Sequence, residues 1–258
     1  MTETRSSTAF AREVGDGWTR LVRGAVHGET LLLPGGSLGI GGEAFAEMNW
    51  ADVYGPDGAA AADALRAFAL RLRERGLPGV ITAKSDVAGE ASAAAAELGL
   101  QSDDDPMPLM ACRADQARPV PARLGTDRVT DQALVPQVAE VLGEAFECPL
   151  WMCVNMLGPD LVSLPDVDFF LARFEGEMAS VVGTVRVGPT VGVYGVGTRP
   201  RLRRRGAASS ALSAAMEYHL ELGAAAFGLH ASTEGAFVYE RLGFEVVDQV
   251  SSWVVDAA

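Results

Sequence analysis

The chain has 258 residues and a formal net charge of −13, and 48% of its residues are hydrophobic. This composition is sufficient for one large or two small hydrophobic cores, and the acidic charge argues against nucleic acid as a partner. The three cysteines and three histidines are too few, and too irregularly spaced, for a disulfide framework or a metal site. We therefore expect a globular protein with reduced cysteines and no bound metal.

Membrane insertion and secretion are not expected. No apolar run approaches the roughly 20 residues that a spanning helix needs, and the first ten residues lack the apolar stretch of a signal peptide. The sequence accordingly predicts a cytoplasmic protein. Its oligomeric state is left open between monomer and homodimer.

In chain order, the first half alternates between helices and strands. Apolar residues at helical spacing predict a helix over 63–75, followed by a strand at Gly79–Ala83. A second helix is predicted over 87–98, and a strand over 107–112 closes this half. Residues 114–131 are rich in Arg, Pro and Gly, as is typical of a linker.

The second half follows a similar order after an ambiguous beginning. A strand is predicted at Thr190–Thr198, and a helix then runs to about Leu222. A short buried strand over 225–230, a helix over 232–243 and a last strand over 244–255 complete the chain. The repeated order predicts two units that share one plan.

Glycines support the repeat because they end the helices at matching places in both halves, namely Gly76, Gly99, Gly223 and Gly243. We expect an α/β (α+β) fold built from two mixed, mostly antiparallel sheets flanked by helices. The predicted domains are residues 1–116 and residues 117–258.

The loop between the strand at 190–198 and the following helix is the most distinctive segment. Arg203, Arg204 and Arg205 run directly into Gly206 and small residues. The first turn of a helix leaves backbone N–H groups without partners, and the helix dipole adds positive charge there. Small residues let a diphosphate approach these amides, so the segment predicts a pyrophosphate site.

Two motifs of this half resemble the GNAT family of N-acetyltransferases. Arg203, Gly206 and Ala208 match the family's acyl-CoA loop, which reads Gln/Arg-x-x-Gly-x-Gly/Ala. Residues 237–244 (FVYERLGF) are similar to the aromatic-rich closing signature of the family, at the expected distance from the loop. The resemblance is strong over 167–255 and weak before residue 167.

This resemblance implies an acyl-CoA-dependent N-acetyltransferase with acetyl-CoA as co-substrate. An amine of a small molecule or peptide would attack the thioester directly in a ternary complex. The pyrophosphate would be held by Arg203, Arg204, Arg205, Gly206, Ala207, Ala208 and Ser209.

The resemblance also implies roles around the thioester. The pantetheine arm would lie along Val196, Gly197 and Thr198, with the Val196 amide polarising the thioester oxygen. Tyr239 would protonate the leaving thiolate. Ser232 stands where many members have an asparagine that contacts the cofactor, so it either replaces that contact or only caps the helix.

No sequence motif identifies the residues that would bind the acceptor amine. Glu147, Trp151 and Asn155 lie in a region that faces the acceptor in this family, with Glu147 as a weak candidate for the base that accepts the amine proton. Water is an equal alternative. His219 and His230 are interpreted as structural residues.

The first half lacks the corresponding chemistry. Residues 54–61 (YGPDGAAA) replace the arginine loop, and Asp57 would repel a pyrophosphate. We interpret this segment as a plain turn into a helix, and the first half as a degenerate copy that walls one side of the substrate cleft. Two alternatives remain open: a non-catalytic acyl-CoA-binding or sensor protein, and an acyltransferase that uses another acyl group.

Overall fold

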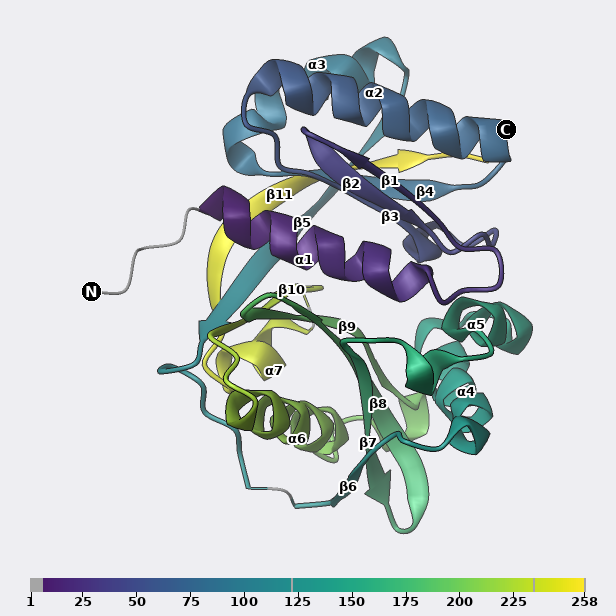
Figure 1. Ribbon diagram of the computed structural model, residues 1–258, viewed down its shortest axis with the longest axis vertical. Helices are drawn as coiled ribbons and strands as arrows, with labels where there is room; N and C mark the ends of the chain where they lie inside the picture. The colour runs from purple at the N-terminus through teal and green to yellow at the C-terminus, as the bar shows by residue number, and fades with distance from the viewer. Residues whose placement is uncertain (1–6, 122, 234, 258) are drawn as a thin grey trace.

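The computed structural model describes residues 7–121, 123–233 and 235–257. Their strands form one mixed sheet that runs through the whole height of the molecule (Figure 1). From one edge to the other, the strands are β1 (Glu29–Leu33), β2 (Gly36–Ile40), β3 (Asn49–Val53), β4 (Gly79–Ala83), β11 (Glu245–Val255), β5 (Gln101–Arg113), β10 (Ala226–His230), β9 (Thr190–Thr198), β8 (Glu177–Val187), β7 (Val167–Phe174) and β6 (Gly125–Arg128).

Helices cover this sheet in separate groups. The α-helices are α1 (Ser7–Val22), α2 (Gly58–Arg75), α3 (Ala88–Glu97), α4 (Val135–Phe146), α5 (Leu150–Leu157), α6 (Ala207–Glu221) and α7 (Ala236–Glu240). In Figure 1, α2 and α3 lie over the upper strands, α1 crosses the middle, and α4 to α7 surround the lower strands. None of the helices in the described segments is long and apolar enough to cross a bilayer.

The two halves of the chain exchange their closing strands at the centre of the sheet. β4 of the first half pairs antiparallel with β11, and β10 of the second half pairs antiparallel with β5. β5 and β11 in turn pair with each other. On the outer sides of this centre, β3 runs parallel to β4 and β9 runs parallel to β10.

The mixed α/β fold with flanking helices is therefore as predicted, but the two expected sheets are joined into one. The exchange explains the difference, because each closing strand covers an edge that would otherwise be left unpaired. Gly79–Ala83 and Ala226–His230 occupy matching places on either side of the central pair. That residues 1–116 are a degenerate copy forming a separate domain stays a prediction.

Each hydrophobic core contains residues from the closing strand of the other half. Trp253 and Val255 of β11 are buried in the core beneath α2 and α3. Met110 and Cys112 of β5 are buried in the core around α6. Each half therefore completes the apolar packing of the other.

Local signals explain where several helices begin and end. α2 starts earlier than predicted because Asp57 accepts a hydrogen bond from the Ala60 amide at 2.9 Å and caps the helix. Gly76 ends α2 with a φ of 63°, as its position in the sequence indicates. The segment 54–61 is thus a capped turn into a helix.

A buried histidine makes the folded state sensitive to acid. His219 of α6 is bonded through Nε2 to Thr184 Oγ1 at 2.9 Å, and burial lowers its pKa to about 4 although nearby Asp168 acts in the opposite direction. The unfolded chain, with a histidine pKa near 6.5, binds the proton first as the pH falls. Stability is therefore complete above pH ~6.5 and is lost as the pH falls toward 4.

We expect this group alone to remove about 2 kcal/mol of unfolding free energy between pH 7 and pH 5. Urea unfolding at the two pH values would measure the loss. His219→Gln should reduce the difference between the two pH values, whatever its effect at pH 7. An unchanged difference in the variant would contradict the assignment.

Candidate functional site

A cavity opens where two parallel strands of the sheet separate. β9 pairs with β10 only over Thr190–Gly192, whereas β10 continues to pair with β5 as far as His230. The cavity has a volume of about 360 Å³, and residues 193–196 of β9 form part of its wall. The backbone of β9 is therefore free of a strand partner on the side where an extended guest could lie.

A β-bulge marks the same part of β9. Val181 pairs with Gly197 and Gly183 pairs with Tyr194, so Gly195 and Val196 together face one residue of β8. Gly195 has a φ of 55°, which a glycine adopts without strain. The bulge turns the strand at Gly195 and Val196, both of which line the cavity.

The remaining residues assigned to the pantetheine arm lie just beyond the bulge. Gly197 is buried, and its carbonyl oxygen accepts a hydrogen bond from Ser180 Oγ at 2.7 Å. The Thr198 hydroxyl is 3.0 Å from the same Ser180 oxygen. These contacts hold the end of β9 where it enters the arginine loop.

The loop after β9 has the shape expected of an anion site. A short 3₁₀ turn, η5 (Pro200–Leu202), leads to Gly206, whose φ of 82° places it just before α6. The first backbone amide of α6 that donates a helical hydrogen bond is that of Ser210, which donates to the Gly206 carbonyl at 3.0 Å. The amides of Ala207, Ala208 and Ser209 therefore precede the helical hydrogen-bond ladder and are available to an acceptor.

The arginines near this loop divide into two groups. Arg199 is buried and ion-paired with Glu140, Glu144 and Glu177, and Arg201 is paired with Glu177. Both charges are thus compensated within the protein.

Arg203, Arg204 and Arg205 are exposed, and among the described residues none of them has a carboxylate partner. Arg203 donates to the Ala145 carbonyl at 3.1 Å, and Arg205 lies over the Phe174 ring. The three arginines of the motif are the ones whose charge is left for a ligand. An added Cβ at Gly206 would meet no atom within 4 Å, so the loop is open in front of them.

Tyr239 and Ser232 line the same cavity as Val196. Tyr239 belongs to α7 and is buried, and this burial raises the pKa of its phenol to about 12. The phenol therefore holds its proton at neutral pH. Ser232 Oγ accepts a hydrogen bond from the Gly235 amide at 3.1 Å, as a helix-capping serine does.

The residues predicted on the acceptor side are not brought into the cavity. Glu147 ends α4 in the left-handed conformation and is exposed, and Trp151 is 56% exposed. Asn155 donates to Glu43 Oε1 at 2.8 Å instead. The opposite face of the segment lines the cavity, including Cys148, Cys153 and Met156, because this is the apolar face that packs inward.

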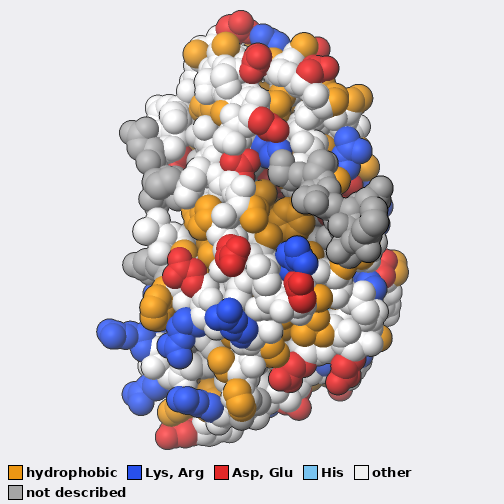
Figure 2. Space-filling view, turned by 90° about the vertical axis from the view of Figure 1, so that its left-hand side faces the viewer, with side chains coloured by type: hydrophobic (Ala, Val, Ile, Leu, Met, Phe, Trp, Pro, Cys, Tyr) orange, Lys and Arg blue, Asp and Glu red, His pale blue; other side chains and the backbone are white. Residues whose placement is uncertain are grey.

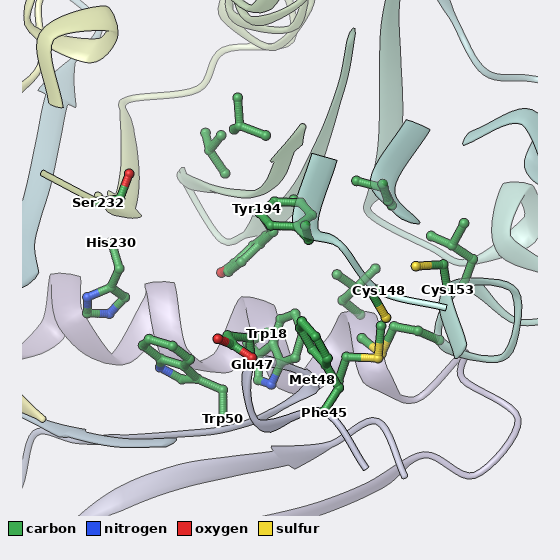
Figure 3. Close-up of a pocket in the computed structure, with 18 of the residues that line it drawn as sticks. Trp18, Phe45, Glu47, Met48, Trp50, Cys148, Cys153, Tyr194, His230 and Ser232 are labelled. Carbon is green, nitrogen blue, oxygen red and sulfur yellow. The ribbon is translucent and has the colours of Figure 1, made fainter. Parts of the chain in front are cut away.

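The other wall of the cavity comes from the first half of the chain. It is formed by α1, β3 and a short 3₁₀ turn, η1 (Ala46–Met48), through Trp18, Phe45, Glu47, Met48, Trp50 and Asp52. Figure 3 labels Trp18, Phe45, Glu47, Met48 and Trp50 among these side chains, together with Tyr194 and the two cysteines of the lining. The first half was expected to wall the substrate cleft, but these wall residues could not be predicted because no motif marks them.

His230 was interpreted as structural, yet it lines the cavity at the end of β10. Its Nε2 lies 2.9 Å from Asp52 Oδ1, and its ring centroid lies 5.7 Å from that of Trp50. Asp52 also accepts from Thr82 Oγ1 at 2.8 Å and from Trp50 Nε1 at 3.3 Å. The sequence separates Asp52 from His230 by most of the chain, which is why their pairing was not foreseen.

The chain is similar to known acetyltransferases both in sequence and in fold. Residues 142–244 match the sequence model of the acetyltransferase (GNAT) family. A solved GCN5-related N-acetyltransferase from Kribbella flavida is similar to the chain with a TM-score of 0.72 at 18% identity, over 99% of this chain and 97% of that chain. The chain has the GNAT fold.

Two further structures with the GNAT fold agree. A putative acetyltransferase from Novosphingobium aromaticivorans is similar with a TM-score of 0.59 at 19% identity, covering 96% of this chain and 98% of its own. A tandem GNAT protein from the clavulanic acid biosynthesis pathway is similar with a TM-score of 0.56 at 16% identity, covering 86% and 79%. No curated protein matches the sequence.

The matched segment and the cavity do not coincide. The segment includes the GNAT loop, Val196 and Tyr239, whereas Trp18, Glu47 and Asp52 lie outside it. The segment that matches the family model therefore supplies one part of the cavity lining, and residues outside the match supply another part.

Proposed function

We propose that this protein transfers an acetyl group from acetyl-CoA to a primary amine in a ternary complex. The observation that carries the proposal is a single cavity that contains the bulged, unpaired stretch of β9 and the buried phenol of Tyr239. The open arginine loop follows β9 directly in the chain. These three elements are what amide formation at a CoA thioester requires.

The loop fits the diphosphate of acetyl-CoA. The free amides at 207–209 and the uncompensated charges of Arg203, Arg204 and Arg205 would hold it. Val196, Gly197 and Thr198 would bind the pantetheine arm as an added strand, as their unpaired edge permits. When bound, acetyl-CoA supplies the thioester carbonyl, toward which the Val196 amide would donate.

Tyr239 and His230 would handle the two protons of the reaction. As the amine nitrogen bonds to the acetyl carbon and the carbon–sulfur bond breaks, Tyr239 gives its proton to the departing sulfur. His230 accepts the proton that the amine loses. With Nε2–H donating to Asp52, Nδ1 is the basic atom; it has no hydrogen-bond partner among the described residues and is buried, so the imidazole ring would have to turn for Nδ1 to meet the amine. Asp52 stabilises the charged imidazole, as a carboxylate does in hydrolytic triads.

One acetyl-CoA per chain is proposed. The equivalent segment of the first half is the capped turn at Asp57, which contains no arginine and places a carboxylate at the start of α2. The tandem GNAT protein noted above supports interpreting residues 1–116 as a degenerate copy. Its proposed role is to complete the sheet and to wall the acceptor side of the cavity.

A thiol-release assay with acetyl-CoA and a panel of amines tests the function. We expect turnover by the wild type, and a fall on the order of a hundredfold or more in His230→Gln, since a positioned base contributes about 10² to 10⁴. Glutamine can still donate to Asp52. His27→Gln is the matched control, because His27 is exposed and outside the cavity.

The outcomes separate the alternatives. Binding of acetyl-CoA without thiol release for any amine would favour a non-catalytic sensor. Release from a longer acyl-CoA at a higher rate than from acetyl-CoA would favour a different acyl group. Equal rates in wild type and His230→Gln would reject His230 as the base while leaving the transferase function in place.

A further inference from the structure

The cavity wall opposite β9 carries one carboxylate that the protein itself does not use. Glu47 lies on η1 and lines the cavity, and it has neither a hydrogen-bond nor an ion-pair partner among the described residues. Asp52, the other acidic lining residue, accepts from Thr82, Trp50 and His230 and is thereby compensated. A cation brought into the cavity would therefore find Glu47 available.

Aromatic side chains line the same wall as this exposed carboxylate. Trp18, Phe45 and Trp50 line the same wall, and in Figure 3 the Glu47 carboxylate is drawn between the rings of Trp50 and Trp18. Aromatic faces attract cations, and the attraction grows where water is excluded. The wall combines the two features that bind an ammonium group attached to an apolar body.

The segment that carries Glu47 is held firmly in place. The buried Asn49 side chain donates to Glu43 O at 2.8 Å and to Pro78 O at 2.8 Å, and its oxygen accepts from the Gly42 amide. The Glu43 carboxylate is bonded in turn to Asn155 of α5. The wall is thus largely formed before any ligand arrives, which lowers the entropic cost of binding.

No positive charge balances this wall. None of the residues that line the cavity in the described part of the chain is Lys or Arg. The two cysteines in the lining are neutral, because burial raises the pKa of Cys148 and raises that of Cys153 to about 12. A carboxylate, phosphate or sulfate on the acceptor would enter an apolar space beside Glu47 without a counter-charge.

Figure 2 shows hydrophobic side chains gathered at mid-height of one face, with a Lys or Arg side chain directly below them. Further Lys and Arg side chains gather toward the lower part of this face.

We propose that the acceptor is a small primary amine carried on an apolar or aromatic group without an acidic substituent, and that Glu47 binds its ammonium, which releases one proton to solvent water before the neutral amine attacks and gives its second proton to His230. This inference rests on the proposed function and assigns its acceptor class. Amino acids, phosphorylated amines and polyamines are disfavoured, the last because a second ammonium would find no second free carboxylate. The cavity of about 360 Å³ lies within the range of small-molecule sites.

The test compares acceptors that differ in one group. 2-Phenylethylamine and L-phenylalanine share the ring and the amine, and only phenylalanine has a carboxylate. We expect kcat/KM for 2-phenylethylamine to exceed that for phenylalanine by at least about a hundredfold. The carboxylate of phenylalanine would be repelled by Glu47 and would find no positively charged partner in the cavity. Spermidine should be at least about tenfold poorer than 2-phenylethylamine.

Glu47→Gln should raise KM for 2-phenylethylamine about tenfold and leave the Kd of acetyl-CoA unchanged. Glu90→Gln is the matched control, because Glu90 is exposed on α3 and the same charge is lost outside the cavity. Quenching of tryptophan emission by 2-phenylethylamine, in the presence of CoA, gives a readout that does not depend on turnover.

Two results would overturn the inference, and they are distinguishable. Phenylalanine or spermidine acetylated as well as 2-phenylethylamine, or a Glu47→Gln variant indistinguishable from Glu90→Gln, rejects this acceptor class and leaves the transferase function intact. Failure of the wild type to acetylate any amine rejects the proposed function, and this inference with it.

Discussion

Tyr239→Phe should lower the acetyl-transfer rate by about a hundredfold to ten-thousandfold, the usual contribution of a positioned acid. The ring packs against Phe244 and is buried, so phenylalanine keeps the packing and removes only the hydroxyl. Because burial raises the pKa of Tyr239 to about 12, the wild-type phenol is neutral and able to donate at neutral pH. The affinity for acetyl-CoA should change little.

Thiol release at saturating acetyl-CoA, together with the melting temperature, measures both effects. Tyr218→Phe is the control, since Tyr218 lies on α6 and does not line the cavity. A merely structural Tyr239 predicts a rate within a few-fold of wild type and a melting temperature close to that of wild type, because phenylalanine keeps the ring packing. An unaltered rate would end the acid assignment and leave water as the proton source.

Gly206→Glu should weaken acetyl-CoA binding by on the order of a hundredfold or more. A carboxylate at this position would stand before the amides at 207–209 and beside Arg203 to Arg205, where the diphosphate must approach. Charge-assisted hydrogen bonds are worth about 1.5–3 kcal/mol each, so losing even one or two gives this reduction. Isothermal titration of wild type should give one site per chain.

Backbone strain must be separated from charge in this experiment, because Gly206 has a φ of 82°. Gly206→Asn provides the comparison, since asparagine tolerates the left-handed region and is neutral. The space around the added side chain is open, so neither variant creates an internal clash. Equal affinity of Gly206→Glu and wild type, or two sites per chain, would contradict the proposed cofactor loop.

Predicted elements in both halves agree with the structure where local signals are strong. The helix over 87–98 is observed as Ala88–Glu97, and the strand at Gly79–Ala83 has the predicted bounds. The helix predicted over 232–243 is reduced to Ala236–Glu240. The strand predicted over 107–112 extends to Gln101–Arg113, because β11 pairs along much of its length.

The proposed cofactor site could be predicted from the sequence because its parts are local. An arginine loop, a glycine with positive φ and a helix start follow one another within a few residues, and the helix start supplies free amides wherever it occurs. The closing signature also lies within one short segment. Val196 and Tyr239 line one cavity, as adjacent elements of this half of the fold allow.

The acceptor side could be seen only in the folded chain. Glu147, Trp151 and Asn155 are close in sequence to residues that line the cavity, but Glu147 ends α4 in an exposed position, and Trp151 and Asn155 lie away from the face of α5 that packs inward. Glu47, Asp52 and His230 share no motif, and the folded chain brings all three to the cavity lining, where His230 Nε2 lies 2.9 Å from Asp52 Oδ1.

The alternation of helices and strands and the glycine turn that opens the helix after β9 follow from the sequence, since short-range geometry sets them, whereas diphosphate binding by the loop and the acid role of Tyr239 stay predictions. The tertiary structure decided that the sheet is one rather than two, and that the first half supplies an aromatic wall with a free carboxylate. The physical reason is that strand pairing and apolar burial act between segments far apart in the chain, where residue spacing carries no information about which surfaces meet.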